Sequence, residues 1–227
     1  MKKIIIISLL CFCRVQSYSQ LLEDKTNFYI GYQSGTYLGS ELFNDQGTIS
    51  PSFYSNLKSN NGLMVKGTVK LLPIFDTGAK IVFSNSTNWQ SESFTNYRNS
   101  YASTITIQPV IQIHNPFKNA GLYNALKMFA EISPLIGYST IDIQNNLFDI
   151  SGVRPDKNRL FSHSLVYGIE AGIGCEYSFT NTVGTFVNLS MQETFINSPL
   201  LIDTRYTLMS LNLGIRLNIT KVKRFNY

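Results

Sequence analysis

The chain has 227 residues, a length that allows one or two domains and suits a single all-β barrel. Charged residues make up 15% of it, well below the roughly 25% of an average globular protein. The formal net charge is +5, and it falls to +2 when the basic residues of the predicted leader, Lys2, Lys3 and Arg14, are removed. A charge balance this small does not indicate a nucleic-acid partner.

Residues 1–19 predict a secretory signal peptide that is cleaved after Ser19, which leaves 20–227 as a single domain. Two lysines follow the first methionine, an apolar run comes next, and Ser17 and Ser19 supply the small residues that the cleavage site needs. Two alternatives are a buried N-terminal strand and a lipoprotein signal at Cys11. The second fits poorly, because two leucines precede this cysteine where a small residue is expected.

Apolar and polar residues alternate along eight segments, which is the pattern of strands that face two different environments. The last segment is the clearest: Met209, Leu211 and Leu213 share one face, while Ser210 and Asn212 share the other. It is fourteen residues long, which exceeds an ordinary globular strand and suffices to cross a bilayer at a tilt. The predicted strands are, in chain order, 27–37, 61–72, 75–85, 101–113, 127–141, 163–179, 183–193 and 206–219.

The connections between these segments alternate between long and short. Those near 73 and 181 are tight turns, and 114–126 is a longer connection on the same side. Short turns on one side and long loops on the other are typical of outer-membrane barrels. Because the strand number is even, the ring can close and satisfy every backbone group in lipid. The sequence thus predicts an all-β, eight-stranded antiparallel up-and-down transmembrane β-barrel, with long polar loops at 38–60, 86–100, 142–162 and 194–204.

Aromatic residues gather near the predicted strand ends, as expected where a barrel meets the two membrane interfaces. Toward the long loops lie Phe83, Trp89, Tyr101, Tyr138 and Tyr206. Toward the short turns lie Phe28, Phe75, Phe117, Tyr123, Tyr177 and Phe179. We therefore predict two aromatic girdles.

The leader, the amphipathic segments and the aromatic C-terminus together resemble small eight-stranded outer-membrane β-barrel proteins, and most of all the porin-like barrels of the Bacteroidetes type. The resemblance rests on FYIGYQSG (28–35), FAEISPLIGYS (129–139), YGIEAGIGCEYSF (167–179) and LNLGIRLNI (211–219). It implies a location in the bacterial outer membrane, in contact with its lipid, and no catalytic residues, because the family shares none. The tail Thr220–Tyr227 departs from the many barrels that end their last strand on a terminal aromatic, and the sequence leaves its role open.

The inward faces of the predicted strands carry equal numbers of cations and anions. An eight-stranded barrel is only wide enough for side chains to fill, and charges buried there must pair. We therefore predict a lumen plugged by ion pairs rather than an open channel. Glu131 and Glu176 lie on neighbouring strands, so Arg216 or Lys70 is expected to reach between them. Strand direction places Lys66, Lys80 and Glu170 nearer the middle, and Lys70, Asp76, Glu131, Glu176 and Arg216 toward the periplasm.

Pro109 and Pro134 fall on the outward faces of neighbouring predicted strands at similar heights. Each lacks the backbone N–H that strand pairing uses. The pair predicts a lateral break in the wall toward lipid, a device similar to that of the lipid A palmitoyltransferase barrel. Two tolerated bulges are the alternative interpretation.

Little in the sequence indicates enzyme chemistry. Cys175 is the one cysteine after the leader, so an intramolecular disulfide is excluded. His114 and His163 are predicted on opposite sides of the membrane, where they cannot share a metal ion. His163 has a serine directly on each side, whereas one residue separates the two in outer-membrane lipid A deacylases. We predict no catalytic residues, no metal and no cofactor.

The first functional hypothesis is a structural or interaction barrel that meets an unidentified protein partner through its external loops. Loops 38–60 and 142–162 are the candidates, the second with Arg154, Asp156, Lys157 and Arg159. A narrow porin or lipid-handling barrel and an outer-membrane lipid-modifying enzyme are the alternatives. A soluble lipocalin-like barrel would need a polar outer face. The sequence leaves the oligomeric state open.

Overall fold

The computed structural model describes residues 25–38, 57, 59–72, 74–89, 97–114, 126–146, 157–180, 182–197 and 205–220. The predicted leader 1–19, the tail after Thr220 and most of each long loop lie outside the described residues. So do Phe117 and Tyr123 of the predicted girdle and Arg154 and Asp156 of the predicted loop surface.

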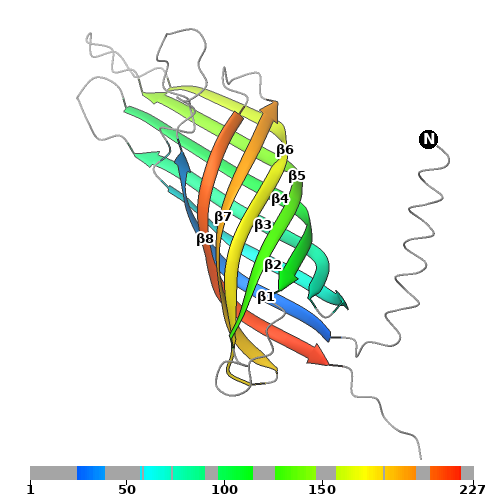
Figure 1. Ribbon diagram of the computed structural model, residues 1–227. Coiled ribbons are helices and arrows are strands. Elements are labelled where there is room, and N and C mark those ends of the chain that lie inside the picture. Colours follow the sequence, from blue (N-terminus) through cyan, green and yellow to red (C-terminus); the bar gives the residue numbers. More distant parts are fainter. Residues whose placement is uncertain are drawn as a thin grey trace, which may run out of the picture.

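All eight predicted strands are present, and they close into one antiparallel barrel in which each strand pairs with its neighbours in the chain (Figure 1). The ring closes where β8 pairs with β1 along the whole length of β1. The predicted fold class is confirmed. The strands are β1 Lys25–Leu38, β2 Ser59–Leu72, β3 Phe75–Trp89, β4 Tyr97–His114, β5 Leu126–Asn146, β6 Lys157–Ser178, β7 Val183–Asn197 and β8 Arg205–Thr220.

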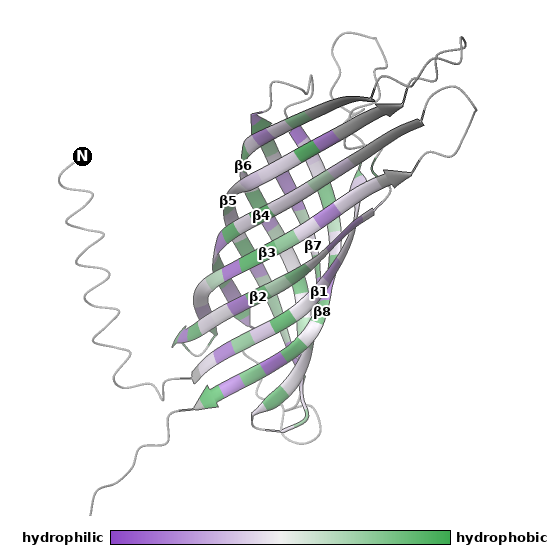
Figure 2. Cartoon of the chain, turned by 180° about the vertical axis from the view of Figure 1, so that it is seen from behind, coloured by the Kyte–Doolittle hydropathy of each residue, from purple (hydrophilic) through white to green (hydrophobic). Residues whose placement is uncertain are grey.

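The barrel forms because every strand has two chemically different faces. Along β7, buried and exposed side chains alternate almost without interruption. The exposed positions are apolar, such as Val187, Leu189 and Met191, and the buried ones are polar, such as Asn188 and Ser190. Figure 2 shows the same alternation of hydrophobic and hydrophilic residues along the tilted strands. Burial is thus the reverse of that in a soluble protein, with apolar side chains outside and polar ones inside.

The strands extend further toward the loops than the sequence predicts. β5 and β6 have 21 and 22 residues, and the pairing between them reaches Asn146↔Lys157. The predicted loop 142–162 is therefore too wide. The alternation of apolar and polar residues fades beyond Asp142, but backbone hydrogen bonds need no apolar side chains, so the ladder continues. We call this end of the barrel the loop end, and the end at residues 73 and 181 the turn end.

Candidate functional site

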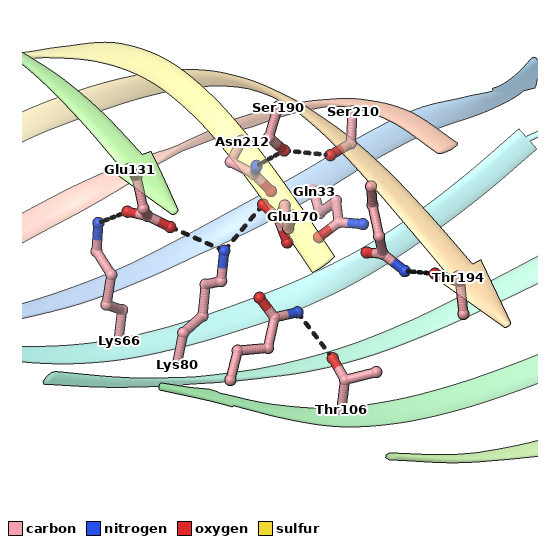
Figure 3. A network of polar contacts seen from close by, with 12 residues as sticks. Gln33, Lys66, Lys80, Thr106, Glu131, Glu170, Ser190, Thr194, Ser210 and Asn212 are labelled. Carbon is pink, nitrogen blue, oxygen red and sulfur yellow. Dashed lines mark hydrogen bonds and ion pairs between the residues drawn. The ribbon is translucent and has the colours of Figure 1, made fainter. Parts of the chain in front are cut away.

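The lumen contains a cluster of four charged side chains that come from four strands. Lys66 of β2 and Lys80 of β3 each approach Glu131 of β5 with an N–O distance of 2.9 Å. Lys80 also approaches Glu170 of β6 at 2.9 Å, so that its ammonium group bridges the two carboxylates. Figure 3 shows the four side chains meeting in the middle of the lumen. With two cations and two anions the cluster is neutral, which is what burial of charge requires.

Three aromatic rings enclose the Lys66 ammonium group. Its Nζ lies 4.1 Å from the ring centroid of Tyr29, 5.1 Å from that of Phe129 and 5.8 Å from that of Phe186. Cations are attracted to the faces of such rings at these distances. Two glycines leave room for the rings: a Cβ at Gly31 would lie 2.7 Å from Phe186 Cζ, and one at Gly174 would lie 2.5 Å from Phe129 Cζ.

A second ion pair joins β8 to β6 and corrects one expectation. Arg216 donates to Glu176 at 2.8 Å and to the Ser178 hydroxyl at 2.7 Å. The expected bridge from Arg216 or Lys70 between Glu176 and Glu131 is wrong, because Glu131 is held by the two lysines instead. Glu131 belongs with the middle layer, since the long lysine side chains reach farther along the barrel than strand height alone indicates. The Tyr29 hydroxyl donates to Glu176 at 2.7 Å, and so links the second pair to the cage around Lys66.

The remaining charged residues of the predicted network lie apart from these clusters. Asp76 approaches His114 Nε2 at 3.0 Å. Lys70 is half-buried and, among the residues that the structure describes, no ion pair includes it. Thus six of the eight predicted network residues lie in ion pairs, which form two separate groups, and Asp76 contacts His114 instead.

A layer of uncharged polar side chains lies beside the charged cluster. Ser190 and Ser210 are 2.9 Å apart, and the Asn212 amide donates to Ser190 at 3.2 Å. Several buried polar atoms of this region have no partner in the structure, and among them are Gln108 Oε1, Ser133 Oγ, Asn188 Oδ1 and Asn212 Oδ1. This layer therefore leaves hydrogen-bonding capacity unused, and so does Arg216 Nε beside the second ion pair.

Apolar side chains fill the lumen at the loop end, a feature that the sequence reasoning missed. Tyr206, predicted in the lipid-facing girdle, is 4% exposed and packs inside the barrel, because it falls on the same face of β8 as the polar residues Ser210 and Asn212. The sequence does carry a signal for this layer, since Ile141 and Val166 both fall on the inward face of their predicted strands. The layer consists of Leu57, Ala102, Ile141, Val166, Ile196, Tyr206 and Leu208.

The wall itself is interrupted at the two prolines. β4 and β5 pair through Ile107↔Ile136 and again from Ile111↔Ile132, and the three positions between them are missing from the ladder. The register is the same on both sides of the gap, so Pro109 lies opposite Pro134 and neither strand carries a bulge there. On their other edges the prolines stay in the ladders, with Ala79↔Pro109 and Pro134↔Ile169.

The outer face of β4 to β7 carries a shallow groove near the turn end. Its volume is about 620 Å³. Ile113, Met128 and Ile173 line it and are each more than half exposed. Gly174 and the edge of Phe129 contribute to it from the wall. The groove therefore faces the surroundings of the barrel rather than its lumen.

The structure separates His163 from the two serines that adjoin it in the sequence. His163 points outward and contacts Thr140 through Nδ1 at 3.1 Å, whereas Ser162 and Ser164 point into the lumen and are buried. Successive residues of a strand face opposite sides, so the adjacent serines cannot be reached. Within the described strands, no group of three or more His, Cys, Asp or Glu side chains could hold a metal ion. No helix in the described part of the chain is long and apolar enough to cross a membrane.

Comparison with solved structures finds other barrels at low sequence identity. Neisserial surface protein A is 10% identical, with 86% of this chain and 97% of that chain covered and a TM-score of 0.46. Ail of Yersinia pestis is 13% identical, with 86% and 100% covered and a TM-score of 0.42. OprG of Pseudomonas aeruginosa is 11% identical, with 87% and 97% covered and a TM-score of 0.49. No family model and no curated protein matches the chain.

These likenesses carry no functional argument, and the class of protein follows from the barrel itself. Large apolar side chains cover its outside, among them Ile30, Leu63, Ile107, Ile136 and Leu213, each between 45% and 62% exposed. Charged and polar side chains, the aromatic rings around Lys66 and the apolar layer at the loop end fill its inside. A closed sheet satisfies every backbone group without water, except at the two prolines. The protein is an eight-stranded transmembrane β-barrel.

Proposed function

We propose that this protein is a bacterial outer-membrane barrel with a closed lumen, which acts as a structural or interaction protein through its external loops. The observation that carries the proposal is the filling of the lumen in successive layers. Toward the turn end lies the Arg216–Glu176 pair, in the middle the Lys66–Glu131–Lys80–Glu170 cluster, and at the loop end the apolar layer.

The charged cluster and the apolar layer oppose conduction for different physical reasons. An ion that entered the middle of the lumen would have to replace ion pairs with N–O distances of 2.9 Å, whose charges are already neutralised. At the loop end it would have to shed water among side chains that are mostly apolar and so are poor ligands. The closed lumen favours a barrel that holds loops at the cell surface over a narrow porin.

The location in the outer membrane is supported by the apolar outer surface and the resemblance of the sequence to outer-membrane barrels. Removal of residues 1–19 during export and a relationship to the Bacteroidetes porin-like barrels are parts of the same proposal. The partner is a protein, and the long connections after β1 and β5 are its proposed contact regions. The lipid-modifying enzyme is disfavoured by the opposite orientations of His163 and its neighbouring serines.

Two experiments test the proposal. Purified protein in planar lipid bilayers should give no steady openings, and steady openings of nanosiemens size would contradict the closed lumen. Variants that lack residues 41–54 or 148–155 should fold, as judged by heat-modifiable gel migration, but lose capture of the surface partner. The first deletion keeps Leu57, because that residue belongs to the apolar layer. Unchanged capture by both variants would refute a role for these loops.

A further inference from the structure

The gap between β4 and β5 has a definite hydrogen-bonding chemistry. In an antiparallel ladder, a hydrogen-bonded pair exchanges two N–H···O bonds, and each adjoining position depends on one of them. Replacing both residues of one such pair by proline removes both donors. Three consecutive residue pairs are then lost from the ladder. This is the gap observed between Ile107↔Ile136 and Ile111↔Ile132. The carbonyl oxygens of Pro109 and Pro134 thus face each other without the N–H groups that would bond them.

An independent contact confirms the direction of these carbonyls. The Thr77 hydroxyl of β3 donates to the Val110 carbonyl at 3.1 Å, so that carbonyl faces β3. Successive carbonyls along a strand face opposite neighbours. The Pro109 carbonyl therefore faces β5, where Pro134 lies.

The seam, defined as Pro109, Pro134 and the gap between them, lies within apolar surroundings on the outside. Ile107 and Ile136 on one side of it are 54% and 55% exposed, and Ile111 and Ile132 on the other side are 40% and 44% exposed. Hydrocarbon offers no hydrogen-bond donor, so unmatched carbonyls there are costly.

Polar groups without partners lie directly behind the seam. Gln108 and Ser133 flank the prolines on the lumen side, both are 0% exposed, and Gln108 Oε1 and Ser133 Oγ have no hydrogen-bond partner. The seam thus combines unmatched acceptors in the wall with unmatched polar atoms inside it. All of them could be satisfied by an O–H group.

An ion pair holds the seam in register from inside. Lys80 is the register partner of Gln108 on β4, and Glu170 is the register partner of Ser133 on β5. The Lys80–Glu170 pair therefore spans from β3 to β6 across both interrupted strands. This strut adds a link across the gap from inside the barrel, beside the β4–β5 ladder that continues in the same register on both sides of the gap.

We propose that the seam is a binding site for the hydroxyl group of a membrane amphiphile whose acyl chain lies against the outer face of β4 and β5. The hydroxyl donates to the Pro109 or Pro134 carbonyl at a depth where lipid chains ordinarily carry no donor. The apolar groove that includes Ile113 and Ala130, two register positions beyond Ile111↔Ile132, offers the chain a place toward the turn end. The inference rests on the proposed membrane location of the barrel.

The sequence permits a direct test on the intact protein, because Pro109–Val110 is the only Pro–Val dipeptide in the chain. Carbonyl-¹³C proline with ¹⁵N valine therefore gives one NMR signal, which belongs to the Pro109 carbonyl. The protein is reconstituted in phospholipid vesicles with increasing amounts of hydroxystearic acid, whose hydroxyl lies near mid-chain, or of stearic acid as the matched control. We expect the Pro109 signal to shift saturably with hydroxystearic acid and to stay in place with stearic acid.

The variant Pro134→Ala supplies the control. It keeps the Pro109–Val110 label and gives the Pro109 carbonyl an N–H donor from β5, so its signal should no longer respond to hydroxystearic acid. The inference is overturned if the wild-type signal moves equally with both acids or with neither. It is also overturned if the signal receives magnetisation from water protons alone, which would assign the seam to water. Integration into the vesicles is checked first by gel migration and protease protection, and its failure would contradict the proposed function instead.

Discussion

Removal of the Lys80 ammonium group should be among the most damaging single changes in this barrel. The substitution Lys80→Met keeps most of the side-chain volume and deletes the charge. Lys80 is 1% exposed and contacts both Glu131 and Glu170 at 2.9 Å. After the change Glu131 keeps Lys66 as its partner, whereas Glu170 keeps no ion partner among the described residues.

The magnitude follows from the balance of attraction and desolvation. At 2.9 Å the Coulomb attraction is roughly 6 kcal/mol for each contact with an effective dielectric constant of about 20. Much of it offsets the desolvation of the buried charges, and breaking such a pair costs about 3–5 kcal/mol net because one charge stays buried without a partner. That range corresponds to roughly a hundredfold to a few thousandfold change in the unfolding equilibrium.

The double variant Lys80→Met with Glu170→Gln separates an uncompensated charge from lost packing. It leaves the neutral Lys66–Glu131 pair, so we expect it to recover most of the stability that Lys80→Met loses. Lys70→Met serves as the matched control, because Lys70 faces inward but is only half-buried; we expect a change within about 0.5 kcal/mol.

The measurement is urea unfolding in phospholipid vesicles, with the folded fraction read from gel migration without heating. Amide hydrogen exchange should also show that Lys80→Met loosens β4 and β5 more than β7 and β8, because the strut spans the seam. If the double variant is as unstable as Lys80→Met, or if Lys70→Met costs as much, the charge argument is refuted.

Three further predictions concern the other layers. Gly174→Val should destabilise the barrel by about 1–3 kcal/mol in the same urea assay, because its side chain would collide with the Val187 carbonyl oxygen of the neighbouring strand and with the Phe129 ring. Gly67→Val is the control, because a Cβ at Gly67 would lie no closer than 3.6 Å to its nearest neighbour. Tyr29→Phe should cost about 1.5–3 kcal/mol, the range for a hydrogen bond to a charged group, since Glu176 loses one donor; an unchanged midpoint would contradict it. Ile196→Ala, in the apolar layer, should cost about 2–5 kcal/mol yet give no steady conductance in planar bilayers, because the ion pairs still close the lumen.

The fold could be predicted from the sequence because the constraint on a membrane-spanning sheet is local and repetitive. Every strand must be apolar on one face, and the even number of strands permits closure. The strand ends were less predictable, since β5 and β6 pair well beyond the alternating region, as far as Asn146↔Lys157. Beyond that region backbone hydrogen bonds extend the strands, and the side-chain pattern does not indicate where the strands end.

Which residues point into the lumen could be predicted from the sequence, but which of them form ion pairs with one another could not. The alternation of faces along each strand is enough to place four residues inside the barrel: Lys66, Lys80, Glu131 and Glu170. It could not show that the lysines cross the lumen from β2 and β3 to β5 and β6, because the reach of a long side chain is not encoded in strand height. The alternation of faces along β1 places Tyr29 inside, but it does not indicate that the ring of Tyr29 contacts Lys66 and its hydroxyl contacts Glu176.

A comparison of free energies explains why the wall can tolerate the gap between β4 and β5. Two prolines opposite each other cost the β4–β5 ladder two backbone hydrogen bonds, and a net bond contributes only about 0.5–1.5 kcal/mol. Separating the Lys80–Glu170 pair that spans the gap would cost about 3–5 kcal/mol, because it would leave one charge buried without a partner, so the pair resists any parting of β3 from β6. Because Lys80 is shared between Glu131 and Glu170, the cluster that closes the lumen is also the one that holds the seam. A barrel that opened its lumen through this cluster would therefore also loosen its wall, which favours a lumen that stays closed.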